Sequence, residues 1–407
     1  MQRSKNNVKN LLAAILFLTF VFNSNTSFAQ TTGNFAAERE RAVKLVNENK
    51  FSEALPLLEK LAASKEADAQ IFLGIGLSYW RLQNTGKDKA AWKQMRLKAK
   101  QNFLKAKELG ASEPEIDVLV ASIKPDGGDK NQSDNPQAQA LSEEAFQAFA
   151  AKDYKKAASV YQKAATLDPA HYESALYTGN SYYALKDYDK SGIWFAKAIA
   201  LDPNRETAYR YWGDALMNGG KNKEAQDKFF DAVIAEPYSN AAWKGLLYFA
   251  QLNNIKMAHP KIDNPVQVSF DENGNLKMDM NGESIIAGKD NGTLAWTAYG
   301  LTRSLWRKEK FARAFPSEKK YRHSLMEEAD ALRSVLVLAD EKKSVIKNLS
   351  PDLAALKTLS NAGLLEAYIL LARADDGIRQ DYAAYRQNNR EKLNRYLAEY
   401  VVKNGGN

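Results

Sequence analysis

Residues that could carry out catalysis are few in this chain. It has three histidines, His171, His259 and His323, and no cysteine. The histidines lie far apart and lack the spacing of metal ligands, so we expect neither a metal site nor a cofactor. The absence of cysteine excludes a thiol nucleophile, a disulfide scaffold and a lipid-modified cysteine. His323 beside Tyr321 and Ser324 could in principle act in catalysis, but we expect a partly exposed structural histidine.

Adjacent carboxylates are the other candidates for chemistry. Glu327-Glu328 and Asp375-Asp376 could supply the two carboxyl groups of a glycoside hydrolase. Adjacent residues of a helix point to different faces, so we expect both pairs on solvated surface. The chain lacks a phosphate-binding loop, a dinucleotide fingerprint and a Gly-x-Ser-x-Gly motif. We therefore expect no enzyme; the alternative is a repeat-delivered cell-wall glycan hydrolase with its active site in residues 255–407.

A repeat with a period of 34 residues sets the architecture. Pro169, Pro203 and Pro237 recur at this interval, each after an acidic residue. Aromatic and small residues recur in the same register: Tyr161, Phe195 and Phe229; Ala157, Ser191 and Ala225; Ala164, Ala198 and Ala232; Ala145, Gly179 and Gly213. Such a period is typical of stacked helical hairpins, which bury their apolar faces against one another.

Each unit is predicted to form two helices, for example Glu173–Leu185 and Tyr188–Ala200. Small residues on both helices allow a close antiparallel approach, and the aromatic side chains fill the space beside them. The residue before a proline is disfavoured in the helical region, so each acidic-proline pair is expected to end a second helix.

This pattern resembles the tetratricopeptide repeat (TPR) family. In the best repeat the motif residues are Gly179, Tyr182, Tyr188, Ser191, Phe195, Ala198 and Pro203. The resemblance implies a helical-hairpin solenoid that binds a protein or peptide in the concave groove lined by the first helix of each repeat. In this chain the groove residues would be Phe149, Tyr177, Asn180, Tyr183, Arg210, Asp214, Lys244 and Tyr248.

The basic and amide groups of this groove suggest how it could hold a ligand. Asn180, Arg210 and Lys244 could bind a peptide backbone or a terminal carboxylate. Leu176 and Tyr211 stand where TPR proteins that clamp a C-terminal carboxylate have lysine and asparagine, so that specific clamp is not expected. Two alternatives stay open: the chain's own C-terminal third fills the groove, or the protein is structural and self-associates through the solenoid ends.

The N-terminus has the pattern of a secretory signal peptide. Three basic residues precede the apolar run 11–22, and small residues lead to a cleavage site between Ala29 and Gln30. Removing residues 1–29 takes away three positive charges and no negative ones, which changes the formal charge from +8 to +5. We expect a periplasmic or secreted protein; an uncleaved N-terminal anchor is the alternative.

The fold class expected is all-α: a TPR-type helical-hairpin solenoid followed by a β-hairpin and a C-terminal helical domain. The hairpin is expected around the Asn273-Gly274 turn. The expected organisation is a signal peptide (1–29), diverged TPR-like helices (35–123), a polar linker (124–137), three repeats plus a cap helix (138–254), a loop and β-hairpin (255–292) and a helical domain (293–407).

In the N-terminal region we expect two repeats, the second with an enlarged loop at Asn84–Lys93 before a helix at Met95–Leu109. The last domain should hold helices over Gly292–Arg307, Ser317–Lys342, Ser350–Ala374 and Ile378–Val402.

A run of basic residues lies on and before the helix expected at Met95–Leu109. It comprises Lys87, Lys89, Lys93, Arg96, Lys98, Lys100, Lys105 and Lys107. We expect a solvated helix face; weak contact with anionic envelope polymers or lipid is the alternative. Nucleic acid is not expected as a partner of an exported chain, and the sequence does not indicate the oligomeric state.

Overall fold

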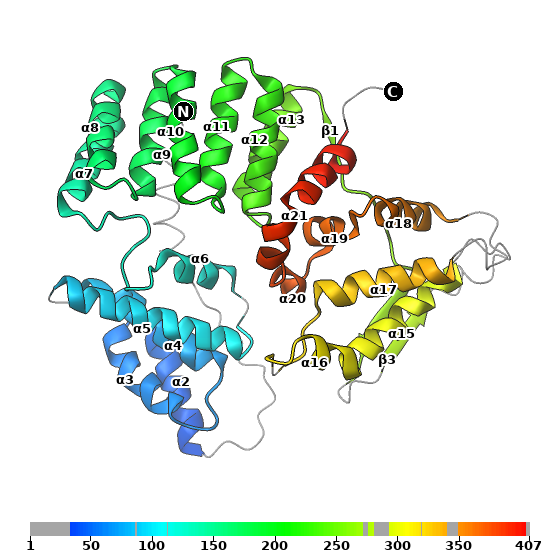
Figure 1. Ribbon diagram of the computed structural model, residues 1–407. Coiled ribbons are helices and arrows are strands. Elements are labelled where there is room, and N and C mark those ends of the chain that lie inside the picture. The colour runs from blue at the N-terminus through cyan, green and yellow to red at the C-terminus, as the bar shows by residue number, and fades with distance from the viewer. Residues whose placement is uncertain are drawn as a thin grey trace. The chain divides into compact units, whose positions relative to one another are not determined.

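The computed structural model describes residues 33–85, 88–111, 113–271, 276–280, 293–318, 320–339 and 349–403 (Figure 1). The expected signal peptide and its cleavage site lie outside the described residues. The chain forms two compact units, one of residues 1–143 with 163–173 and one of residues 144–162 with 174–407. This division falls within the first expected repeat rather than at residues 124–137. Among the described residues, no helix combines the length and apolarity needed to span a membrane.

The first unit is a series of antiparallel helices. They are α2 (Gly33–Asn47), α3 (Phe51–Ala62), α4 (Ala69–Leu82), α5 (Lys89–Glu108) and α6 (Pro114–Ser122), with a short 3₁₀ turn, η1 (Gln83–Thr85). A Cβ on Gly76 would lie 2.5 Å from the Phe103 ring, so α4 and α5 approach through a glycine. Helix α5 starts at Lys89, before the expected Met95, because Asp88 caps it by accepting a hydrogen bond from the Ala91 amide at 2.8 Å.

Residues 124–137 fold against α5 through one buried arginine. Arg96 is 2% exposed and lies between the rings of Trp80 and Trp92, 4.8 and 4.7 Å from their centroids. Its guanidinium donates hydrogen bonds to the carbonyls of Gly127 (3.1 Å) and Ser122 (3.2 Å). Residues 124–137, whose polar composition predicts a linker, are thereby held in a defined conformation.

The repeat array consists of helical hairpins of nearly constant length. Its helices are α7 (Pro136–Ala150), α8 (Tyr154–Leu167), α9 (Tyr172–Ala184), α10 (Tyr188–Leu201), α11 (Glu206–Asn218), α12 (Asn222–Ala235) and the final α13 (Asn240–Leu252). Figure 1 shows α9 to α13 standing side by side. Helices α8, α10 and α12 each end just before an acidic-proline pair, which confirms the predicted stops.

The small and aromatic residues of the repeat form its buried interior. Ala157, Ser191 and Ala225 are fully buried, as are Ala164, Ala198 and Ala232. A Cβ on Gly179 would lie 2.7 Å from the ring of Phe195, so only glycine fits at this approach. The TPR-type solenoid expected from the sequence is confirmed.

The backbone repeats as regularly as the side chains. The turns between the two helices of the three hairpins each contain one residue with positive φ, namely Lys152 (66°), Lys186 (63°) and Gly220 (77°), and Asn254 (55°) holds the same position after the cap helix α13. These positions are 34 residues apart. Lysine pays a steric cost of roughly 1–2 kcal/mol in this left-handed conformation, whereas glycine does not.

Replacing Lys186 or Lys152 by glycine should therefore raise the free energy of unfolding by about 1 kcal/mol, after allowance for the greater freedom of glycine in the unfolded chain. Urea unfolding followed by circular dichroism measures the change. Lys163→Gly, on the exposed face within α8, is the matched control and should lower stability by about 1 kcal/mol. A loss of stability in Lys186→Gly equal to that of the control would contradict the strain argument.

The last domain contains two short sheets and several helices. The strands are β1 (Lys256–Met257), β2 (Val266–Phe270), β3 (Leu276–Met280) and β4 (Val402–Lys403). The helical elements are η2 (Thr293–Trp296), α15 (Thr297–Leu305), η3 (Trp306–Lys310), α16 (Phe311–Ala314), α17 (Leu325–Leu338), α18 (Pro351–Asn361), α19 (Leu365–Tyr368), η4 (Ile369–Arg373), α20 (Asp376–Arg379), α21 (Tyr382–Tyr396) and η5 (Leu397–Val401).

The predicted β-hairpin is present: β2 and β3 pair antiparallel from Val266 opposite Met280 to Phe270 opposite Leu276. Its expected turn at 272–275 lies outside the described residues. The helix expected over Ser350–Ala374 is interrupted at Gly363, which has φ of +70°. The helix expected over Ser317–Lys342 starts only at Leu325, where the Ser324 side chain caps it.

The last domain and the end of the array share one hydrophobic core. Tyr382 donates a hydrogen bond to the Ile234 carbonyl at 2.6 Å, and Arg386 donates one to the carbonyl of Ala235. These carbonyls belong to the last turn of α12, where a helix has no partners of its own. On the side of α13, His259 lies against Trp243, with ring centroids 5.4 Å apart. The last domain thus docks on the C-terminal end of α12 and on α13.

Candidate functional site

The expected groove residues lie on the first helices of the hairpins and on the cap helix. Phe149 is on α7, Tyr177, Asn180 and Tyr183 on α9, Arg210 and Asp214 on α11, and Lys244 and Tyr248 on α13. Because i, i+3 and i+4 positions share one helix face, Asn180 and Tyr183, Arg210 and Asp214, and Lys244 and Tyr248 each present neighbouring side chains.

Two of the expected groove residues pack onto aromatic residues of α8. The rings of Phe149 and Tyr154 have centroids 5.1 Å apart in an edge-to-face arrangement. Tyr177 stacks on Tyr161 at 5.6 Å with an interplanar angle of 23°. Both groove residues are half-buried, so they form part of the wall rather than a free ligand contact.

Arg210 is bound within the array. Its Nε donates to one carboxylate oxygen of Glu206 at 2.7 Å and a terminal nitrogen to the other at 3.1 Å. Burial alone would lower the pKa of Arg210, but the Glu206 carboxylate outweighs this and raises it. The sequence signal for this pair is an acid four residues before a base in one helix. Arg210 is therefore committed to Glu206 and is poorly placed to receive a ligand carboxylate.

The three first helices at the end of the array bring Tyr183, Asp214 and Tyr248 together. The amide nitrogen of Asn218 donates to the Tyr183 hydroxyl at 3.1 Å and to the backbone carbonyl of Asp214 at 2.8 Å. Burial, together with the neighbouring Asp214, Tyr188 and Tyr248, raises the pKa of Tyr183 to about 12. Asn218 was not among the predicted site residues.

The surface of α13 is open. Tyr248 is 42% exposed and Lys244 is exposed as well. The contacts that the last domain makes with α12 and α13 involve the carbonyls of Ile234 and Ala235 and the ring of Trp243. At α13, the described residues of the C-terminal third leave Lys244 and Tyr248 exposed and so do not cover this part of the expected groove.

A hollow of about 790 Å³ is bordered by the turn before α10, by α10 itself, by the second half of α11 and by the turn that follows α11. Trp212 and Leu216 line it together with Ile193, whose side chain is 58% exposed. Gly192 lets the Trp212 indole approach, since a Cβ there would lie 2.8 Å from its nitrogen. The sequence did not single out this hollow.

The prediction that Glu327 and Glu328 lie on solvated surface was wrong. Glu327 is 0% and Glu328 2% exposed. The two side chains do point to different faces of α17, but both faces are covered by basic and phenolic groups. Glu327 pairs with Arg303 at 2.9 Å, and Glu328 pairs with Arg373 at 3.2 Å. The Tyr299 hydroxyl donates to Glu328 at 2.6 Å.

His323 completes this buried charge cluster. Its Nδ1 lies 2.7 Å from an Asp375 oxygen, and its Nε2 lies 3.1 Å from Glu328. Both ring nitrogens therefore lie next to carboxylates. This is the arrangement of a structural ion pair rather than that of a general base that acts on a substrate. Burial lowers its pKa, but Asp375 and Glu328 outweigh burial and raise the pKa of His323 to about 8. Among the described residues, no group of histidine, aspartate or glutamate side chains is arranged to hold a metal ion.

This cluster predicts a pH dependence of stability. A histidine whose pKa rises from 6.5 to about 8 on folding stabilises fully below pH 6.5, and the contribution disappears as the pH rises through 8. The expected loss is about 2 kcal/mol between these values. Urea unfolding at a series of pH values, followed by tryptophan fluorescence, measures it, since Trp296 and Trp306 lie in the same domain.

His323→Gln should remove the slope in this window. His259→Gln is the matched control: burial lowers the pKa of His259, so its own contribution falls below pH 6.5 and its variant should keep the slope. An unchanged slope in His323→Gln would contradict the assignment.

The basic run on α5 is largely engaged by the chain itself. Lys93 pairs with Asp126 and Lys107 with Asp117. Lys100 donates to the carbonyl of Ile123 at 2.9 Å. These partners leave less free positive charge on this helix than its composition suggests.

Comparison with known proteins places the array in a family. Residues 142–206 match the model of the tetratricopeptide repeat family. No curated protein matches the chain at a significant level. The array therefore contains tetratricopeptide repeats, as the sequence resemblance implied.

Similar solved structures include TPR domains. The first TPR domain of Spaghetti (RPAP3), bound to an HSP90 peptide, is 24% identical over 30% of this chain and 96% of its own, with a TM-score of 0.28. The Yersinia enterocolitica chaperone SycD, in complex with a YopD peptide, is 18% identical over 29% and 95%, with a TM-score of 0.27. MamA is 17% identical over 48% and 94%, with a TM-score of 0.24. These values carry no information about the partners of this chain.

Proposed function

We propose that the protein is an exported, non-enzymatic TPR scaffold that binds a protein or peptide partner in the cell envelope through the face formed by α9, α11 and α13. The observation that carries the proposal is the open surface at Tyr248 and Lys244, on a helix whose other side is buried in the core shared with the last domain.

The docking of the last domain supports this assignment. The end of a helical stack must be covered, because its last hairpin exposes an apolar face. Here α13 and the last domain cover α12, where Phe230, Val233 and Ile234 are buried. The first helices keep a face that this covering does not use, with aromatic rings held on a rigid frame. Rigid aromatic side chains are the usual anchors of protein interfaces.

The buried carboxylates do not favour the alternative of a glycan hydrolase. Such an enzyme needs two carboxyl groups that flank the bond of a bound sugar. Glu327 and Glu328 are enclosed; arginine and tyrosine groups bind Oε1 of Glu327, and arginine, histidine and tyrosine groups bind both oxygens of Glu328. Release of sugar from peptidoglycan by the purified chain, lost in Glu328→Gln, would instead establish the enzyme.

The assignment of the partner-binding site to the groove is tested with substitutions at two exposed residues, Tyr248 in α13 and Ile193 in α10. Tyr248→Ala should weaken binding to the partner by about tenfold, because a central aromatic anchor contributes 1–2 kcal/mol or more. The measurement is photo-crosslinking in the native envelope from a probe placed in α13, followed by binding of the isolated partner.

Ile193→Ala is the matched variant, because Ile193 lines the other hollow of the array. We expect it to bind the partner as the unchanged protein does. Weakening by Ile193→Ala together with normal binding by Tyr248→Ala would move the contact to that hollow and refute the groove.

Export is tested separately. The signal peptide proposed for residues 1–29 should be removed, so that the mature protein begins at Gln30 and is recovered from the periplasm or the medium. N-terminal sequencing of the protein from its native cells measures this. Substituting Ala29 by a bulky residue such as leucine should block cleavage, since the site requires a small side chain. An intact Met1 in the recovered protein would contradict cleavage and favour the anchor.

A further inference from the structure

His323 lies between two carboxylates that belong to different elements. Its Nδ1 is 2.7 Å from an oxygen of Asp375, the residue before α20, and its Nε2 is 3.1 Å from an oxygen of Glu328 on α17. The neutral imidazole has a single N–H group, so only the protonated ring can donate to both carboxylates. In the neutral form, one nitrogen would turn a lone pair toward a carboxylate. We call His323, Asp375 and Glu328 the His323 clamp.

The His323 clamp holds the start of α20. Asp375 also caps this helix, since its other oxygen accepts a hydrogen bond from the Ile378 amide at 2.9 Å. The backbones meet here as well, because a Cβ on Gly377 would overlap the carbonyl oxygen of His323. The neighbouring Arg322 donates a hydrogen bond to the Gly377 carbonyl at 2.8 Å. The segment before α17 is thereby joined to α20.

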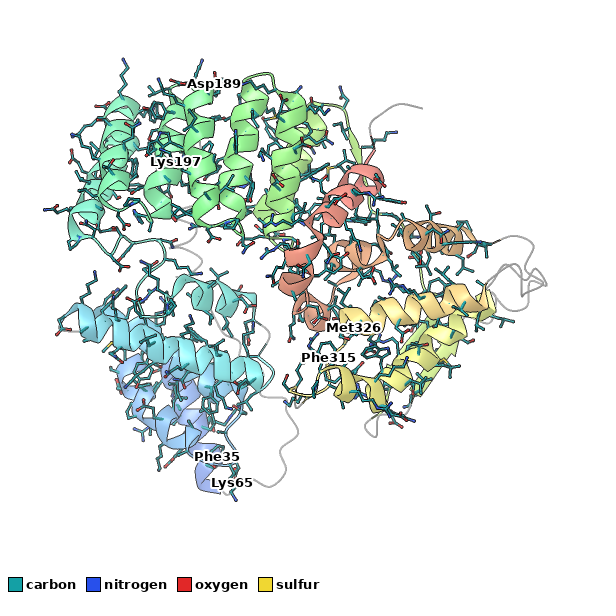
Figure 2. All side chains as sticks on the ribbon, viewed as in Figure 1. Phe35, Lys65, Asp189, Lys197, Phe315 and Met326 are labelled. Atoms are coloured by element: carbon teal, nitrogen blue, oxygen red, sulfur yellow. The ribbon has the colours of Figure 1, made fainter. Side chains whose placement is uncertain are left out.

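Arg322 fastens a second point of the same stretch. Its guanidinium pairs with Asp381, the residue before α21, at 2.7 Å. Asp381 also accepts a hydrogen bond from the Leu325 amide at 2.7 Å. Figure 2 shows Phe315, whose ring centroid lies 4.8 Å from this guanidinium. An arginine keeps its proton in proteins, so the charge on this side of the contact is permanent, whereas that of the His323 clamp is not.

The same stretch carries the contacts with the array. Residues 375–388, the docking segment, comprise α20 and the first part of α21, up to a break in the helix at Asn389 (φ −134°, ψ 27°). Tyr382 and Arg386 within it bind the carbonyls at the end of α12. Figure 1 shows α20 next to the start of α17, and α21 next to α12. The docking segment is thus held by the His323 clamp at its start and binds the array further along.

The groups that contact His323, and the phenols behind them, change charge away from neutral pH. Burial would raise the pKa of Glu328 and of Asp375, but the hydrogen bonds with His323 and the basic neighbours outweigh it and lower both. Burial and the bond to its carboxylate partner raise the pKa of Tyr321 to about 12, and that of Tyr299 rises as well. The other charged groups around the clamp are Arg303 of α15, Arg322, Glu327 of α17, Arg373 of η4 and Asp381.

We propose that the protonation of His323 controls how firmly the docking segment is held on α17, and thereby the attachment of the last domain to the end of α12. The protonated clamp fixes the start of α20 and presents Tyr382 and Arg386 to the carbonyls of Ile234 and Ala235. When the proton leaves, one carboxylate loses its donor, and the docking segment opens more often while the rest of the domain stays folded. The groove takes no part in this device, so its failure would leave the proposed function untouched.

Hydrogen exchange of the full chain, followed by mass spectrometry, tests the clamp. Protection factors, which remove the intrinsic acceleration of exchange with pH, are compared at pH 6.5 and 8.5. The pKa of His323 is about 8 in the closed clamp and returns toward 6.5 on opening, so the clamp stabilises most at low pH. We expect the docking segment to lose about tenfold in protection between the two values. The amides of α18, buried in the same core, should be better protected than the docking segment at both.

Asp375→Asn tests the clamp without removing the helix cap, since asparagine caps a helix as well as aspartate does. It takes one negative charge from the ring, so the loss of protection should occur at lower pH. Asp376→Asn is the matched control: this next carboxylate is 70% exposed and pairs with Arg379 at 3.1 Å, and its removal should leave the midpoint unchanged. His323→Gln should give the lower protection at both pH values.

Three results would overturn the proposal. An equal loss of protection in His323→Gln and in the unchanged chain would assign the pH dependence to another group. A midpoint left in place by Asp375→Asn would separate the ring from α20. Equal protection of the docking segment and α18 at both pH values would mean that the docking segment opens only when the whole domain unfolds.

Discussion

A contact between a glycine and an aromatic ring sets the geometry of this protein. Gly179 faces Phe195, Gly213 faces Phe229 and Gly76 faces Phe103, each with space for a ring where a Cβ would otherwise lie. Close approach of the two helices at this point fixes the spacing of the hairpin. The spacing in turn lets each hairpin stack on the next through buried alanine and serine residues. Because the hairpins pack through this side, the other face of each first helix carries polar and aromatic side chains that the glycine–ring contact does not require.

The sequence predicts well what depends on contacts inside a hairpin. The repeat positions, the proline stops and the β-hairpin could be identified because each follows from residues close together in the chain. The break at Gly363 follows from the positive φ of this glycine, and the late start of α17 follows from the cap formed by Ser324. The continuous apolar periodicity of both segments predicted unbroken helices instead. Helix α5 similarly begins at a cap, Asp88, that a search for repeat residues passes over.

Contacts between distant parts of the chain could not be predicted. Glu327 and Glu328 looked like surface residues because the groups that bury them, Arg303 and Arg373, come from segments more than twenty residues away on either side. Arg96 looked like one member of a basic run, although two tryptophans and a turn near residue 127 enclose it. In the groove, the helix face of each residue could be predicted, but its electrostatic role depended on neighbours. Arg210 is the exception, because its partner Glu206 stands one helical turn before it, and this local spacing already favours a structural ion pair over a ligand contact.

The attachment of the last domain to α12 has a consequence for assembly. A stack of hairpins has two different ends, and joining one end to the other of a second molecule would propagate into an open filament. In this protein the carbonyls at the end of α12 are bound by Tyr382 and Arg386, and the apolar residues beside them are enclosed. That end therefore has no complementary surface to offer a second array. Stacking of a second array directly on the end of α12 is therefore blocked by the chain's own last domain.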